Sequence, residues 1–271
     1  MIGLFILAFF LLLALLGPIL PRIDEMYRPM TGVDKEILWS TPPSRAHLLG
    51  TDFMGRDILS QLAHGARIAF MVGITAALAS VLIGTLVGLV AGYFGRLTDT
   101  LLMRLTDILL TLPSLPLIII IAAVLGKQSL WIIVGIIGLI GWPSTARVIR
   151  AQTLSLKERP FIEAARVSGA SNRRIIIRHI APNILPLSFL YMTFGVTGAI
   201  LAEAGLSFLG LGDPSVVSWG MMLQWCFTTG HTFRALYWVL PPGLSISLIT
   251  FAFYLIGRAL DEIINPRLRE R

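Results

Sequence analysis

The strongest constraint on this chain is a series of apolar runs, each about as long as a bilayer is thick. A helix that crosses the hydrocarbon core needs ~20 mostly apolar residues. Six runs approach or exceed this length, at 2–20, 68–93, 108–126, 130–148, 184–202 and 238–257. Because backbone polar groups in lipid must be paired within the segment, such runs form helices. The runs therefore predict an all-α membrane protein with six transmembrane helices.

The composition argues against an ordinary soluble protein. Only 14% of the residues are charged, whereas soluble domains carry about 25%. The first run has no Lys or Arg before it and no small-x-small cleavage site after it. We therefore expect a retained anchor rather than a secretory signal. The one cysteine, Cys226, is expected to be a free thiol.

Nearly all of the net charge of +7 lies in one loop, because residues 147–179 hold eight basic and two acidic side chains. Lys and Arg mark cytoplasmic loops, so we expect this loop inside the cell. Six spans in the cell (inner) membrane then place both termini inside, and they place the turn at Lys127 and the segment 203–237 outside. Nucleic acid is not expected as a partner, since the basic loop is held between membrane spans.

These expectations divide the chain into consecutive parts. An anchor helix over 1–21 precedes an extracytoplasmic segment over 22–67. A five-helix core follows over 68–258, with its cytoplasmic loop at 150–183, and a cytoplasmic tail closes the chain over 259–271. Within the outer segment, Ile58, Leu59 and Leu62 recur at helical spacing, which predicts a short amphipathic helix on the membrane face.

The basic loop carries the start and stop signals of two short helices. Pro160 suits a first helical position, and Glu163 in or beside the first turn meets the positive end of the helix dipole. Gly169 fits the left-handed residue that ends such a helix. Ser171 or Asn172 can cap a second helix, and Pro182 is expected to end it. Helices this short need a surface to pack on, either their own bundle or a cytoplasmic partner.

Glycine and proline punctuate the predicted spans. Gly84, Gly88 and Gly92 follow at four-residue intervals, a spacing that lets helix backbones approach closely. The contact could be internal or with a second membrane subunit, and a looser series follows at 135, 138 and 141. Pro113 and Pro116 lie inside the third run, where we expect kinks rather than breaks.

Several stretches resemble one family of transport proteins. Glu163-Ala164-Ala165, Gly169 and His179-Ile180-Ala181-Pro182 are similar to the coupling-loop signature of ATP-binding-cassette (ABC) importer permeases, with His and Ala at two usual Ile and Leu positions. Further stretches resemble the "C"-type permease subunit of the dipeptide, oligopeptide and nickel subfamily, and they lie at 50–67, 91–95, 102–107, 205–212, 219–223 and 265–269.

The resemblance implies partners and roles for particular residues. A second, homologous permease subunit would complete the pore, two ATP-binding subunits would bind ATP and Mg, and an extracytoplasmic solute-binding protein would deliver the solute. The ATPase-coupling loop would use Glu163, Ala164, Ala165, Arg166, Gly169, Arg173, Arg174 and Pro182. The face toward the binding protein would include Asp52, Arg56, Asp57 and Trp219. Peptides are the expected solutes, with nickel or metal chelates and short oligosaccharides as alternatives.

The chain itself is expected to have no enzymatic activity, cofactor or metal. It contains no phosphate-binding Gly-x-x-x-x-Gly-Lys-Ser/Thr motif, and its four histidines lack metal-site spacing. A proton-coupled carrier is the remaining alternative, and it needs ionisable residues within the membrane. Arg104 and Asp107 are expected to pair with each other at i, i+3. Glu203 could line the outer mouth of the pore or cap backbone N–H groups.

Overall fold

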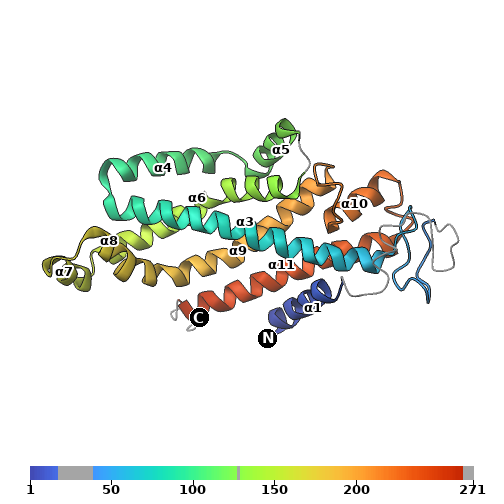
Figure 1. Cartoon of the computed structure of the whole chain (residues 1–271), viewed down its shortest axis with the longest axis horizontal. Coiled ribbons are helices and arrows are strands. Elements are labelled where there is room, and N and C mark those ends of the chain that lie inside the picture. The colour runs from blue at the N-terminus through green and yellow to red at the C-terminus, as the bar shows by residue number, and fades with distance from the viewer. Residues whose placement is uncertain (18–38, 127–128, 265–271) are drawn as a thin grey trace. The chain divides into compact units, whose positions relative to one another are not determined.

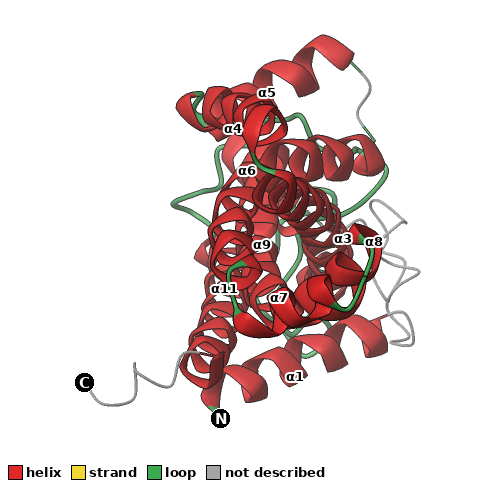
Figure 2. Cartoon of the chain, turned by 90° about the vertical axis from the view of Figure 1, so that its left-hand side faces the viewer, coloured by secondary structure: helices red, strands yellow, loops and turns green. Residues whose placement is uncertain are grey.

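The computed structural model describes residues 1–17, 39–126 and 129–264, and these residues are helical apart from connecting segments and one isolated bridge between Thr51 and Asp57 (Figures 1 and 2). The chain divides into two compact units, each built from three stretches. Unit 1 comprises Met1–Ile74, Ala122–Val134 and Thr197–Leu255. Unit 2 comprises Thr75–Ile121, Gly135–Val196 and Ile256–Arg271.

Eleven labelled helical elements occur in the described residues. They are α1 (Ile2–Leu16), α3 (Ile58–Phe94), α4 (Arg96–Thr111), α5 (Ser114–Leu125), α6 (Leu130–Lys157), α7 (Pro160–Val167), α8 (Asn172–Ile175), the π-helical turn η2 (Ile176–Ile180), α9 (Ala181–Phe208), α10 (Trp219–Thr228) and α11 (Leu236–Ile264).

Four helices are long and apolar enough to cross a membrane, and the bent pair α4–α5 makes a fifth candidate. The four are α3, α6, α11 and the continuous stretch Asn172–Phe208. The predicted first span is described as the 15-residue helix α1, which is about 22 Å long and shorter than the ~30 Å hydrocarbon core. Residues 18–20, which would continue this span, lie outside the described residues, as do the rest of 18–38 and the tail at 265–271.

The expectation of a mere kink in the third predicted span was wrong. The chain breaks after Thr111, and α4 and α5 differ in direction by 88°. Leu112 is extended, with φ −82° and ψ 133°, because the ring of Pro113 disfavours helical angles in the residue before it. Pro116 then falls in the first turn of α5, where backbone N–H groups have no partner within the helix.

The short amphipathic helix expected near residue 58 is the beginning of α3, which continues unbroken to Phe94. Asp57 precedes it and accepts a hydrogen bond from the backbone N–H of Ser60 at 2.8 Å, as a helix-capping residue does. No proline interrupts the chain from this cap to Phe94, so the two expected helices form one.

In unit 2, the glycines of α3 lie directly against α6. A Cβ atom at Gly84, Gly88 or Gly92 would lie 2.6 to 2.7 Å from the nearest atom of α6. Gly88 faces the carbonyl oxygen of Ala146, and Gly92 faces the side chain of Thr153. Of the two contacts left open by the sequence, these three glycines therefore serve internal packing.

Candidate functional site

The helix α7 begins and ends at the residues that the sequence predicted. Pro160 is its first residue, and Glu163 lies in its first turn. Gly169 has φ +80°, and the N–H groups of Gly169 and Ala170 donate to the carbonyl oxygens of Arg166 and Ala165, each at 3.0 Å. This pair of bonds is the Schellman motif, in which a glycine in the left-handed region satisfies the last carbonyls of a helix.

The second arm of the loop differs from the expectation. Ser171 caps α8 by accepting a hydrogen bond from the N–H of Arg174, as predicted. Pro182, however, does not end the helix, because the chain continues through η2 into α9. In η2 the N–H of Ala181 donates to the carbonyl of Ile176, five residues earlier. This wider turn changes the bonding pattern just before Pro182, whose nitrogen has no hydrogen to donate.

One side of the loop is fastened to its own bundle. Ile162 of α7 and Ile175 of α8 have no exposed surface. They belong to a buried cluster whose other members are Leu89, Ile149, Leu156, Ile180 and Ile184. The hydroxyl of Tyr93 also donates to Oδ1 of Asn172 at 2.8 Å. The loop therefore packs on α3 and α6. Of the two surfaces that the sequence allowed for its short helices, their own bundle is one that they use.

The opposite side of the loop is not covered by any of the residues that the structure describes. Val167 is 90% exposed, and Ile177 and Phe161 are 57% and 44% exposed. The exposed residues around them include most of the predicted coupling residues, namely Glu163, Ala164, Arg166, Gly169, Arg173, Arg174 and Pro182, while Ala165 is half-buried. We call this surface the outer loop face. It combines apolar side chains with basic ones, and both kinds are available to another protein.

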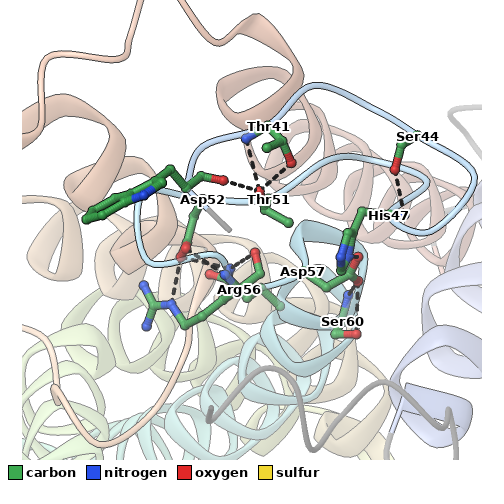
Figure 3. A network of polar contacts seen from close by, with 10 residues as sticks. Thr41, Ser44, His47, Thr51, Asp52, Arg56, Asp57 and Ser60 are labelled. Carbon is green, nitrogen blue, oxygen red and sulfur yellow. Dashed lines mark hydrogen bonds and ion pairs between the residues drawn. The ribbon is translucent and has the colours of Figure 1, made fainter. Parts of the chain in front are cut away.

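In unit 1, three of the predicted outer residues, Asp52, Arg56 and Asp57, take part in a polar network (Figure 3). Asp52 has no exposed surface, and it accepts hydrogen bonds from the N–H groups of Met54 and Arg56 at 2.9 and 3.0 Å. The Nε atom of Arg56 donates to Asp52 at 2.7 Å, and Nε2 of Gln61 donates to it at 3.0 Å. The Arg56 guanidinium also lies 4.0 Å from the ring centroid of Trp225.

A second carboxylate anchors the other half of this network. Asp57 is fully buried, lies 2.9 Å from Nδ1 of His47, and accepts hydrogen bonds from both the N–H and the hydroxyl of Ser60. Trp219 is also buried, and its Nε1 donates to the carbonyl of Leu62 at 2.9 Å. All four predicted outer residues thus make supporting contacts within unit 1, and three of them, Asp52, Asp57 and Trp219, are buried. His47, Gln61 and Trp225 complete the network, and the sequence had offered no periodic signal for them.

Three acidic residues of the long helices have side-chain partners. Asp107 accepts from Nη2 of Arg147 at 2.7 Å, so the expected pairing with Arg104 was wrong. Asp99 is paired with Arg150. Glu203 is 4% exposed and accepts from the hydroxyl of Ser207 at 2.6 Å. Among the described residues, no three His, Cys, Asp or Glu side chains are placed to hold a metal ion.

Asp213 caps a helix from a distant part of the chain. Its Oδ2 accepts a hydrogen bond from the N–H of Leu130, the first residue of α6, at 3.1 Å. Burial alone would raise the pKa of this carboxyl group. Hydrogen bonds from the hydroxyl and N–H of Ser215 and from the N–H of Leu130 outweigh burial and lower the pKa. The ionised form is therefore the one that holds the start of α6.

Comparison with known proteins decides the family. Residues 84–270 match the family described as "Binding-protein-dependent transport system inner membrane component". The chain belongs to this family. The permease is 36% identical over 273 residues to the oligopeptide transport system permease protein OppC of Bacillus subtilis (strain 168), covering 100% of this chain and 86% of that protein. It is 37% identical to the dipeptide transport system permease protein DppC of the same strain, covering 99% and 82%.

A third relative and a solved structure agree with this assignment. The permease is 41% identical to the OppC protein of Haemophilus influenzae, covering 82% of this chain and 71% of that protein. Its fold is similar to a chain of the inward-facing MetNI methionine ABC transporter, with a TM-score of 0.54, 21% identity, and coverage of 74% and 96%. The permease is therefore a multi-pass membrane component of an ABC importer rather than an enzyme. Such importers in general include ATPase and solute-binding partners.

Proposed function

We propose that this permease forms half of the translocation path of an ATP-driven importer of di- and oligopeptides. The support for peptides is that relatives matching nearly the whole chain are oligopeptide and dipeptide permeases. A second, homologous permease subunit supplies the other half of the path. The chain itself carries out no chemistry, and two ATP-binding subunits bind ATP and Mg and supply the energy.

The outer loop face is the proposed docking site for an ATP-binding subunit. The observation that carries this proposal is the pairing of a fixed Schellman turn at Gly169 with uncovered apolar side chains at Phe161 and Val167. One side of the loop is fastened to its own bundle through Ile162. Movement of the ATPase would therefore be transmitted to α3 and α6 rather than lost in a loose loop.

The proposed topology has six spans, with α1 as the first and the α4–α5 pair as the third. Both termini and the loop at 150–183 lie in the cytoplasm. The anchor covers 1–21, the outer segment 22–67, the core 68–258 and the tail 259–271. The buried network of Asp52, Arg56 and Asp57 stiffens the outer segment that receives the solute-binding protein. Trp219 holds α10 against α3 for the same purpose, and Glu203 lies near the outer mouth of the path.

Transport by the reconstituted complex tests this function. The permease, its second permease subunit, the ATP-binding subunits and the binding protein are placed in vesicles, and uptake of radiolabelled dialanine is measured. Uptake is expected to require ATP hydrolysis and the binding protein, and to persist when a protonophore abolishes the proton gradient. Uptake that follows the proton gradient without ATP hydrolysis would sink the proposal. Identification of the ligand that copurifies with the binding protein separates peptides from metal chelates and oligosaccharides.

A further inference from the structure

The exposed side of α4 is divided lengthwise into two stripes of opposite character. Thr100, Arg104, Asp107 and Thr111 are all exposed, and their spacing of four, three and four residues places them on one face of the helix. We call this row the α4 polar stripe. The adjoining face carries an apolar row that is between 49% and 71% exposed, formed by Leu97, Leu101, Leu105 and Ile108.

The remaining side of α4 lies against α6, within the same unit (Figure 1). Thr106 is buried on this side. Asp99 and Asp107 of α4 pair with Arg150 and Arg147 of α6, in reversed order along the two helices. This order shows that α4 runs antiparallel to α6, a candidate membrane span. The α4 polar stripe therefore extends along the direction of a span, rather than across the membrane surface.

Lipid is an unsuitable neighbour for this stripe. The side chains of Asp107 and Arg147 are 52% and 58% exposed even though they pair with each other, and Arg104 is exposed as well. Charged side chains in membrane helices face a bundle interior or a water-filled cavity, because hydrocarbon solvates them poorly. The apolar row needs no such explanation, since exposed leucines are expected wherever a helix meets lipid.

We propose that the α4 polar stripe, together with Arg147, lines the water-filled path of the solute and contacts zwitterionic solutes of the peptide type. This inference rests on the proposed function and adds residues to it. The hydroxyls of Thr100 and Thr111 donate to the carbonyls of Arg96 and Ile108 in their own helix, which leaves their oxygen lone pairs as acceptors. Acceptors and charges of both signs match the ammonium, amide and carboxylate groups of a short peptide. Contacts of this kind are individually weak, as passage requires.

Cysteine labelling of the complete complex in nanodiscs tests whether the stripe meets water. Thr100→Cys and Thr111→Cys are compared with the matched controls Leu101→Cys and Leu105→Cys, which occupy the adjoining apolar row. The reagent is a charged, membrane-impermeant methanethiosulfonate. Cysteines of the polar stripe are expected to react ~10-fold faster or more, because thiolates form in water and are suppressed in apolar surroundings. Equal rates on the two rows would overturn the proposal.

Transport by the labelled complex tests whether solute passes the stripe. Modification of Thr100→Cys is expected to abolish dialanine uptake while ATP hydrolysis continues, whereas treated Leu101→Cys keeps its uptake. Unchanged uptake after complete modification of Thr100→Cys contradicts a path along the stripe. If the unmodified wild-type complex fails to import dialanine but the labelling contrast persists, the water-lined face stands, and the peptide assignment in the proposed function is wrong.

Discussion

At the scale of single residues, glycine is favoured at Gly169 by the backbone angle and not by a lack of space for a side chain. Its φ of +80° lies in the left-handed region, and a Cβ atom there would meet no atom within 4 Å. A side chain is therefore penalised only through the backbone, by roughly 1–2 kcal/mol. This is why the sequence was sufficient to predict the turn. A glycine between the end of one predicted helix and the start of the next indicates a left-handed turn, and this prediction needs no information about tertiary contacts.

Substitution of this glycine should separate docking from folding. Gly169→Val is expected to reduce ATP-driven uptake strongly while ATPase activity and membrane assembly persist, because strain of ~1–2 kcal/mol loosens the Schellman turn. Gly169→Asn should retain most uptake, since Asn tolerates left-handed angles. Gly135→Val serves as a control, because Gly135 is also open within 4 Å but has no positive φ. Full coupling in the Val variant would contradict the docking role of the loop.

Cys226 makes a second prediction at this scale. Burial raises the pKa of its thiol to about 11 from the ordinary 9.0. The folded protein therefore favours the protonated thiol, so this residue's contribution to stability is complete below pH 9 and is lost as the pH rises toward 11. Iodoacetamide should leave Cys226 unmodified in the folded complex at pH 8 and should label it after denaturation. Rapid labelling of the folded complex would show that the thiol is not buried.

At the scale of elements, proline was the least reliable guide to where helices end. Pro113 breaks a predicted span because it forces Leu112 into an extended conformation. Pro182 was expected to end a helix, yet the chain continues through η2 into α9. The outcome depends on whether nearby backbone groups find other partners, and a pattern of residue types does not contain that information. The polar network of unit 1 was missed for a similar reason, because His47, Asp57 and Gln61 come together only through the folded outer segment.

The contact between α3 and α6 is open to a direct test. A methyl group at Gly88 would lie 2.6 Å from the carbonyl oxygen of Ala146 and 2.9 Å from the backbone nitrogen of Arg150. Since backbone atoms cannot move aside locally, Gly88→Ala should separate the helices and destabilise the protein by about 1–3 kcal/mol. Thermal unfolding of the detergent-purified protein measures the loss. Gly135→Ala, which meets no neighbour within 4 Å, should cost nothing, and equal effects of the two substitutions would refute this packing.

At the scale of the whole molecule, the charge distribution predicts which face of the membrane each loop meets. Eight of the 22 basic residues occupy 147–179, so the positive-inside rule predicts that this loop lies in the cytoplasm. Hydropathy predicted that the chain crosses the membrane several times, and four to five described candidates agree. The number six depended on α1, whose described length is only 15 residues, so length and composition alone could not decide it.

Two engineered cysteines determine this topology. Val167 and Leu48 are 90% and 61% exposed, so neither side chain is needed for packing among the described residues of this chain. An impermeant maleimide added to intact cells should label Leu48→Cys and not Val167→Cys, because the positive-inside rule places the basic loop in the cytoplasm. Inverted vesicles stripped of the ATP-binding subunits should show the opposite pattern. Labelling of Val167→Cys from outside would reverse the proposed orientation and remove its contact with the ATP-binding subunits.

The π-helical turn at Ile176–Ile180 has a consequence for how related permeases can diverge. A π turn accommodates one residue more than the α-helical turn that it replaces. Deleting a single residue there would restore regular α-helical winding and leave the residues before the turn on nearly the same face relative to α9, because the π turn absorbs its extra residue within one turn. The direction in which the loop presents Val167 is therefore nearly independent of whether this residue is present. Related permeases can therefore differ by one residue at this position without turning the loop away from its partner.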